Sequence, residues 1–186
     1  MCNNKILTIT LTIFLTLLTG LSQTAMAATP YAQLASNQTQ LADTINQGIV
    51  ATLQNVDNLE EIDWDKEENK LIIKEDGVYF VMAVAQVGAR EYGSALSDNG
   101  GDLSFWFALN DKVIANTGTW HHVSPQSKSN TIVDQYALPL KKGDALSFMF
   151  SASTTSIGMV TFRGTETRPS SPGLSVSVFK MGEIPE

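Results

Sequence analysis

The chain has 186 residues, of which 43% are hydrophobic, and a formal net charge of −7. This length suits one domain with a substantial core. The negative charge disfavours nucleic acid and anionic membrane as partners.

The first 27 residues have the pattern of a secretory signal peptide. Lys5 supplies the positive end, residues 6–18 are a short apolar stretch, and residues 25–27 (Ala-Met-Ala) form a small-x-small cleavage motif. The apolar stretch is shorter than the roughly 20 residues of a membrane-spanning helix, and a retained anchor is the alternative. Cys2 is the only cysteine and would leave with the signal, which excludes disulfides, thiol chemistry and cysteine-ligated zinc. We therefore predict export and a single domain over residues 28–186.

Residues 28–58 hold the N-terminal strands and a polar connection. Residues 31–35 and 49–53 alternate like short strands, and residues 36–47 between them are mostly polar. A helix is the alternative, because several hydrophobic residues have roughly helical spacing. Ser, Thr, Asn and Gln fill the positions between them and form helices less readily. We therefore predict strands in this segment.

Acidic and apolar residues alternate over residues 59–65 (LEEIDWD), which predicts one strand with a solvent-facing side. Glu61, Asp63 and Asp65 would then point the same way. Turns and a further short strand follow, at residues 66–69 (polar turn), 70–74 (strand) and 75–77 (Glu-Asp-Gly turn).

The longest β-like run is residues 77–88 (GVYFVMAVAQVG). Its two alternating sets, which start at Val78 and at Tyr79, are both apolar until Gln86. A strand of an antiparallel sheet normally keeps one polar face toward water. A strand that is apolar on both faces needs two covers, one from a second sheet and the other from another copy of the protein. The sequence leaves open which set faces that copy.

The second half of the chain alternates between strands and turns. Asn110-Asp111 is a two-residue hairpin turn, since both residues tolerate left-handed backbone. Pro139 stands near a strand end, where a missing N–H is tolerated. The predicted strands are residues 102–109, 112–122, 131–140, 145–150, 157–162 and 173–180. The predicted loops and turns are residues 89–101, 123–130, 141–144 and 163–172.

These elements amount to about ten short strands, with no long helix and no internal repeat. Strands at this spacing indicate a sandwich or a barrel. The many hairpin signals favour an all-β, two-sheet jelly-roll sandwich, with residues 59–181 as its core.

Four segments, in this order, have the pattern of one known superfamily. They are Gly77 and Tyr79 in a Gly-x-Tyr-x strand; Asn110 in the turn of FALNDKVIA; Leu138, Leu140, Gly143, Asp144, Leu146 and Phe148 in ALPLKKGDALSFMF; and the closing strand SPGLSVSVFKM. By these segments the chain resembles the C1q/TNF-like superfamily (the globular head of complement C1q and the tumour necrosis factor fold), as a secreted, bacterial-type member. The likeness covers residues 31–181 and is strongest over residues 71–180. It departs from the family at Pro172, where an aromatic residue often stands, and it lacks a Gly-X-Y collagen stalk.

The resemblance implies a ten-stranded jelly roll, a homotrimer and a binding role without catalysis. One face of residues 77–88, together with residues such as Tyr136, should then pack around the three-fold axis. Binding residues often lie on loops of a rigid scaffold, so the predicted recognition loops are residues 89–101, 121–130 and 163–172.

Glu61, Asp63 and Asp65 are the candidate catalytic set. They are similar to the Glu-Ile-Asp-x-Glu strand of laminarinase-type jelly-roll glycosidases, with Asp in the last place. Paired carboxylates suit glycoside hydrolysis because one must ionise while the other stays protonated. An acidic, solvent-facing edge strand that resists edge pairing explains the same residues, and we favour this interpretation.

The remaining polar and aromatic candidates carry weaker signals. His121 and His122 are adjacent on a strand, so they point to opposite faces and are poorly placed to share a metal. Residues 98–102 (DNGGD) offer oxygen ligands for calcium, which some members of the family bind, or form an ordinary turn. Trp106 and Trp120 could contact a carbohydrate or a protein, but we favour a role in packing.

We therefore predict a secreted or periplasmic, non-enzymatic, trimeric recognition module that binds a protein or glycan through its loops. We assign no catalytic, cofactor-binding or metal-ligating residue, and calcium stays an alternative. We expect neither nucleic acid binding nor membrane insertion after signal cleavage. Two other functions stay open: a structural trimerisation head without a ligand of its own, and a small glycosidase using Glu61, Asp63 and Asp65.

Overall fold

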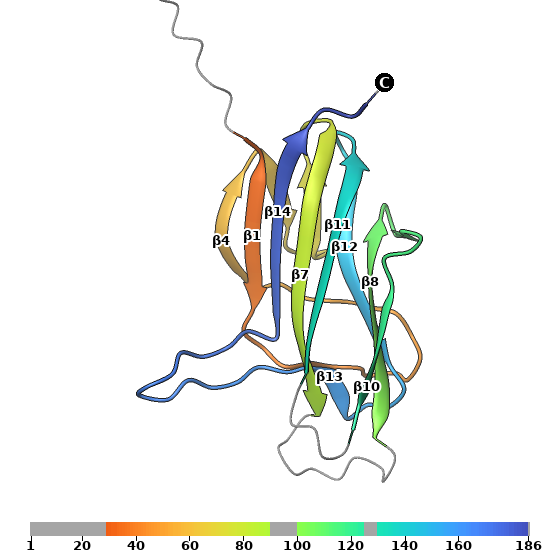
Figure 1. Ribbon diagram of the computed structural model, residues 1–186, viewed down its shortest axis with the longest axis vertical. Coiled ribbons are helices and arrows are strands. Elements are labelled where there is room, and N and C mark those ends of the chain that lie inside the picture. The colour runs from red at the N-terminus through yellow and green to blue at the C-terminus, as the bar shows by residue number, and fades with distance from the viewer. Residues whose placement is uncertain (1–28, 90–99, 125–129, 186) are drawn as a thin grey trace, which may run out of the picture.

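The computed structural model describes residues 29–89, 100–124 and 130–185, which form a sandwich of two antiparallel sheets (Figure 1). The predicted signal peptide lies outside the described residues. Within the described part, no helix is long and apolar enough to cross a membrane. The predicted all-β, two-sheet architecture is confirmed.

Each sheet contains seven strands. Sheet A has the order β2 (Gln40–Leu41), β13 (Ile157–Met159), β7 (Gly77–Ala89), β14 (Leu174–Gly182), β1 (Tyr31–Ser36) and β4 (Asn55–Glu60), and β11 (Asn130–Leu140) pairs with the other side of β7. Sheet B has the order β10 (Thr119–Val123), β8 (Gly101–Leu109), β12 (Ala145–Ala152), β6 (Lys70–Ile73) and β5 (Ile62–Asp65); β3 (Ile49–Val50) pairs with β12, and β9 (Lys112–Val113) pairs with β8.

Strand β7 lies between β14 and β11 along nearly its whole length. Ala83 is opposite Val176 on one side and Asp134 on the other. The odd-numbered residues from Tyr79 to Val87 are at most 1% exposed and face sheet B. The even-numbered residues from Val78 to Gln86 are half-buried and face away from it. The structure thus shows which set faces the second sheet of the same chain.

The core between the sheets is rich in aromatic side chains from sheet B. Phe107 of β8 makes edge-to-face contacts with Phe148 of β12, at a ring distance of 5.2 Å, and with Tyr136 of β11, at 5.4 Å. Burial of one such ring stabilises the fold by roughly 1.5–3 kcal/mol. Tyr136 therefore faces the interior of its own sandwich. The parity of β11 turns it inward, but it is half-buried on an edge strand, and its place at a three-fold axis stays a prediction.

The predicted hairpin turn at Asn110-Asp111 is confirmed. Both residues have left-handed backbone, with φ of 52° and 64°, as the two-residue turn between paired antiparallel strands requires. The turn is tied to the neighbouring strand, since the Asn110 side chain accepts a hydrogen bond from the Ala145 N–H at 2.9 Å.

The predicted strand over residues 59–65 is wrong, because the chain changes sheets inside it. Strand β4 ends at Glu60 in sheet A and β5 begins at Ile62 in sheet B. Glu61 between them has a φ of 51°, which is left-handed backbone that no extended strand contains. Glu61 is therefore not part of one acidic strand face with Asp63 and Asp65.

Several other predicted boundaries also differ from the structure, and β4 begins at Asn55, before the predicted strand. The strand over residues 112–122 is two strands, β9 and β10, with Asn116 (φ 65°) between them. The strand over residues 157–162 ends at Met159, and the one over residues 49–53 pairs only at Ile49–Val50. The polar connection before it contains the short strand β2.

Candidate functional site

The outward side of sheet A carries no Asp, Glu, Lys or Arg on β1, β14, β7 and β11, whereas the edge strand β4 places Glu60 opposite Tyr31. Side chains that alternate away from the core form this surface, called the uncharged face below. They are Tyr31, Gln33 and Ala35 (β1); Ser175, Ser177, Phe179 and Met181 (β14); Val78, Phe80, Met82, Val84 and Gln86 (β7); and Thr131, Val133, Gln135, Ala137 and Pro139 (β11).

Large apolar side chains form the centre of the uncharged face. Phe80 and Phe179 are cross-strand partners whose rings lie 5.1 Å apart. Phe179 is 43% exposed, Met181 51% and Val133 54%. Figure 1 shows β1, β14, β7 and β11 side by side as one broad sheet. Contiguous exposed apolar surface is uncommon on a soluble domain, which makes this face the first candidate site.

A buried carboxylate lies where the two sheets meet at β10 and β11. Asp134 points inward from β11 and is 4% exposed. Its Oδ2 accepts a hydrogen bond from the Thr119 hydroxyl of β10 at 2.9 Å. Burial raises the pKa of the Asp134 carboxyl, and the hydrogen bond from Thr119 opposes this effect. Two positions along β10, the Nε2 atom of His121 is buried without a hydrogen-bond partner.

The two histidines lie on opposite faces of β10. His121 is opposite the buried Leu103, whereas His122 is opposite Asp102, and its Nδ1 lies 2.7 Å from the Asp102 Oδ1. The exposed Trp120 ring stacks near His122, at a ring distance of 6.3 Å. Among the described residues, no three His, Cys, Asp or Glu side chains gather in a way that could hold a metal ion.

The calcium candidate is only partly described, and the two tryptophans differ in their exposure. Residues 98 and 99 of the calcium candidate lie outside the described residues, and Asp102 pairs with His122. Trp120 is 66% exposed and does not pack in the core, contrary to the preferred interpretation. Trp106 is half-buried and lies against Gly48, where an added Cβ would come within 3.0 Å of its ring.

The three acidic residues of the glycosidase candidate have separate roles. Glu61 forms the corner between the sheets. Asp63 pairs with Lys74 at 2.8 Å. Asp65 accepts hydrogen bonds from the N–H groups of Glu67 and Glu68, both at 3.0 Å, and so holds the turn that follows β5. This arrangement does not place the three carboxylates on one strand face around a substrate.

Residues 160–173 form a hairpin that projects from the sandwich end opposite to the C terminus (Figure 1). A cavity of about 530 Å³ lies between this hairpin and the ends of β7 and β11. It is called the hairpin hollow below, and it is lined by Gln86, Thr131, Phe162, Arg163, Thr165, Arg168, Pro169 and Ser171. The predicted loop of residues 163–172 is therefore part of a hairpin with antiparallel backbone pairs.

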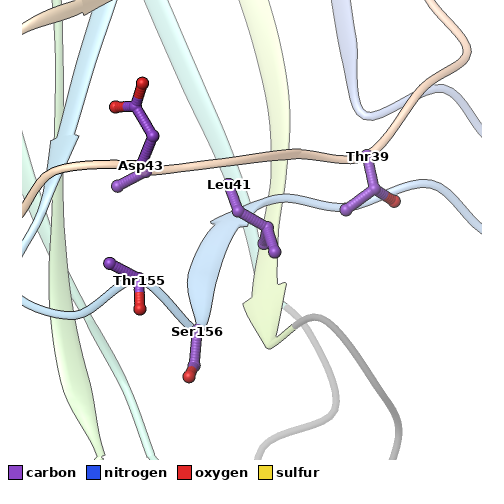
Figure 2. Close-up of a pocket in the computed structure, with 6 residues that line it drawn as sticks. Thr39, Leu41, Asp43, Thr155 and Ser156 are labelled. Atoms are coloured by element: carbon purple, nitrogen blue, oxygen red, sulfur yellow. The ribbon is translucent and has the colours of Figure 1, made fainter.

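A second hollow of about 560 Å³ lies beside the β2–β13 pair. It is lined by Thr39, Leu41, Ala42, Asp43, Thr155 and Ser156. Figure 2 shows the Asp43 carboxylate pointing away from the segment that bears Thr155 and Ser156. No sequence motif marked this hollow, since its residues come from segments more than one hundred positions apart.

Comparison with known proteins supports the fold. No family model matches the chain, and neither does any curated protein. Among solved structures, the globular domain of zebrafish complement 1qA protein is similar, with a TM-score of 0.56 and 16% identity over 84% of this chain and 100% of that one. The structure of Eiger TNF from S. frugiperda is also similar, with a TM-score of 0.56 and 12% identity over 85% and 96% of the two chains. The chain thus has a C1q/TNF-like jelly-roll fold.

Proposed function

We propose that the chain is an exported recognition module that assembles into a homotrimer through the uncharged face of sheet A and binds a protein or glycan through its loops. The observation that carries the proposal is the outward side of β7. It is apolar from Val78 to Val84, and no described segment of the chain lies over it. Water contact with this surface is unfavourable, and a second copy of the chain removes it.

The three-fold stoichiometry and the binding role follow from the resemblance to C1q/TNF-like proteins. Two solved neighbours, a complement 1qA globular domain and a TNF, share the fold. The N-terminal pattern of a signal peptide supports export. Because no described loop carries a catalytic arrangement, the loops are the part of the module best suited to recognition.

The assembly is tested by replacing apolar residues of β7 with Asp on one side at a time. Phe80→Asp with Met82→Asp places two charges on the uncharged face, and we expect a folded monomer. Tyr79→Asp with Val81→Asp places the charges in the core, where both residues are 0% exposed, and we expect unfolding. Light scattering gives the mass, and circular dichroism reports the fold.

Val113→Asp is the matched control, because Val113 is an exposed apolar residue of sheet B, 68% exposed. This variant should keep the mass of the parent protein. A parent protein that stays monomeric at all concentrations contradicts the proposal. A trimer that survives both charges on the uncharged face would assign the interface to another surface and contradicts it as well.

A trimerisation head without its own ligand is the second candidate, because the uncharged face alone accounts for assembly. Binding assays on the purified trimer separate the two candidates. The glycosidase alternative is tested by Glu61→Gln, which should leave the hydrolysis of β-glucan at background, as in the parent protein.

A further inference from the structure

Gln86 of β7 joins both stems of the hairpin of residues 160–173 to sheet A, and Gly173 and Thr161 are further hydrogen-bonded to Ser36 and Thr39. The Gln86 carbonyl accepts a hydrogen bond from the Val160 N–H at 2.7 Å, and its N–H donates to the Gly173 carbonyl at 2.9 Å. The Gln86 side-chain amide donates to the Ser171 hydroxyl. Both stems of the hairpin are thus tied to one point of sheet A, which fixes the walls of the hairpin hollow.

The hairpin's own backbone groups are paired across it. Phe162 and Ser171 exchange two backbone hydrogen bonds, at 3.1 and 2.9 Å, and Thr165 and Arg168 exchange two more, at 2.8 and 3.3 Å. The hollow also presents side chains to a ligand. They are two guanidinium groups, several hydroxyls and one half-buried aromatic ring.

The two guanidinium groups, of Arg163 and Arg168, have no ion-pair partner among the described residues, although Glu166 lies between them in the sequence. Both residues are exposed, line the same hollow, and form no side-chain hydrogen bond or ion pair with any described residue. In contrast, Lys70, Lys74 and Lys180 each pair with a carboxylate within 3.0 Å. Lys66, Lys112, Lys141 and Lys142 also form no ion pair with a described residue, so what distinguishes the two arginines is that they line one hollow.

Guanidinium groups bind carboxylates and sulfates through paired N–H donors. The hydroxyls of Thr131 and Thr165 suit the hydroxyl groups of a sugar, and Phe162 and Pro169 supply apolar surface for a sugar ring. An acidic peptide would normally pair through its backbone with an open strand edge, and Phe162, Thr165, Arg168 and Ser171 already use their backbone groups within the hairpin. The side chains therefore favour a saccharide over a peptide.

We infer that the hairpin hollow binds a segment of an acidic polysaccharide, with Arg163 and Arg168 contacting its carboxylate or sulfate groups. This inference rests on the proposed function and names a ligand class for one of its loops. Binding is local, because the chain as a whole is acidic, and it weakens as salt screens the two charges.

The test measures binding of the exported domain, residues 28–186, to immobilised polygalacturonate, dextran sulfate, neutral dextran and polyglutamate. Polygalacturonate carries carboxylates and dextran sulfate carries sulfates. A comparison of the two polymers therefore shows which anionic group the arginines bind. The parent protein should bind at least one of these two and should not bind neutral dextran. Arg163→Gln with Arg168→Gln should weaken binding by about tenfold or more, as expected for the loss of charged hydrogen bonds.

Lys141→Gln with Lys142→Gln is the matched control, because it removes the same charge from an exposed turn elsewhere. It should change affinity less than about twofold, as for a screened surface charge. An equal loss in both double variants overturns the inference, as does equal or tighter binding to polyglutamate. Failure of the parent protein to bind either acidic polysaccharide also overturns it.

A second variant tests the shape of the hollow. A Cβ on Gly164 would lie 2.7 Å from the Ser170 N and 2.8 Å from the Arg168 O, so the hairpin must open to admit it. Gly164→Ala should therefore weaken polysaccharide binding while both arginines remain. Unchanged binding would show that the arginines act as free charges and would overturn the site.

The mass of each variant separates this inference from the proposed function. A trimer that does not bind acidic polysaccharide removes the inference and leaves the assembly intact. A monomer that binds through Arg163 and Arg168 removes the assembly and leaves the hollow intact.

Discussion

Asp134 is the most unusual single residue of the described core. It occupies an inward position of β11 between Ile132 and Tyr136, where the alternation calls for an apolar side chain. Its one side-chain hydrogen bond comes from Thr119. Burial raises the pKa of the Asp134 carboxyl, and the charge of Asp134 adds to the effect of burial in raising the pKa of Tyr136. A buried polar group with few partners costs free energy.

The raised pKa sets the sign of a pH effect on stability. A carboxyl group that binds its proton more tightly in the folded protein favours folding below its ordinary pKa of 3.8, and this contribution is lost as pH rises through the folded pKa. At neutral pH the ionised Asp134 is therefore a cost. Asp134→Asn should raise the free energy of unfolding by about 1 kcal/mol at pH 7.

The measurement is urea denaturation of both proteins between about pH 4 and pH 8. The advantage of the variant should shrink toward the acidic end, where the parent carboxyl is protonated. Thr119 keeps an acceptor in the variant, because the Asn side chain has a carbonyl oxygen. An advantage that does not depend on pH would contradict the assignment to the Asp134 proton.

At the scale of the element, the short strand β9 shows how a turn and one side chain can end a strand. Strand β9 ends after two residues because the chain turns at Ile114–Thr117, where the Thr117 N–H donates to the Ile114 carbonyl at 3.3 Å. Beyond this turn, the Thr117 hydroxyl makes the hydrogen bond with β8 that a longer β9 would otherwise make. It accepts from the Phe107 N–H at 3.1 Å and donates to the Ile114 carbonyl at 2.8 Å, and the residue is 1% exposed.

Thr117→Val should destabilise the fold by about 1–3 kcal/mol, because it leaves the Phe107 N–H buried without an acceptor while keeping the side-chain shape. Thr155→Val is the control at an exposed threonine and should change stability by less than about 0.5 kcal/mol. Urea denaturation midpoints compare the two. Equal stability of the parent and the Thr117 variant would show that water replaces the hydroxyl.

At the scale of the whole molecule, the sandwich is asymmetric. The outward side of sheet A is uncharged on β1, β14, β7 and β11, whereas charged residues such as Asp63, Lys74 and Asp102 lie on sheet B or beside it. Exposure to water is therefore less favourable for the outward side of sheet A than for that of sheet B. This difference favours association through sheet A and leaves the loops at the ends of the sandwich accessible.

Association of this kind links stability to protein concentration. The thermal midpoint of the parent protein should rise when the protein is concentrated tenfold, by a few degrees for a domain of this size. The Phe80→Asp and Met82→Asp double variant should show no such rise. A parent midpoint that stays constant over the same range would contradict association through the uncharged face.

The sequence by itself determined the elements whose cause is local. Alternation predicted β1, β7, β8, β11, β12 and β14, and the left-handed tolerance of Asn110 and Asp111 predicted their turn. Order and spacing of these elements indicated the jelly roll. The prediction of one strand through Glu61 was wrong. The alternation of acidic and apolar residues continues across the corner at which the chain passes from sheet A to sheet B.

Only the tertiary structure decided which side of β7 faces sheet B, because Tyr79 and Phe80 are both apolar and their neighbours β14 and β11 come from later in the chain. It also placed Arg163 and Arg168 beside Gln86, about eighty positions away. Periodicity reports how a residue relates to its sequence neighbours. Burial and the grouping of charges depend on pairing between distant strands, and that pairing is a property of the folded sandwich.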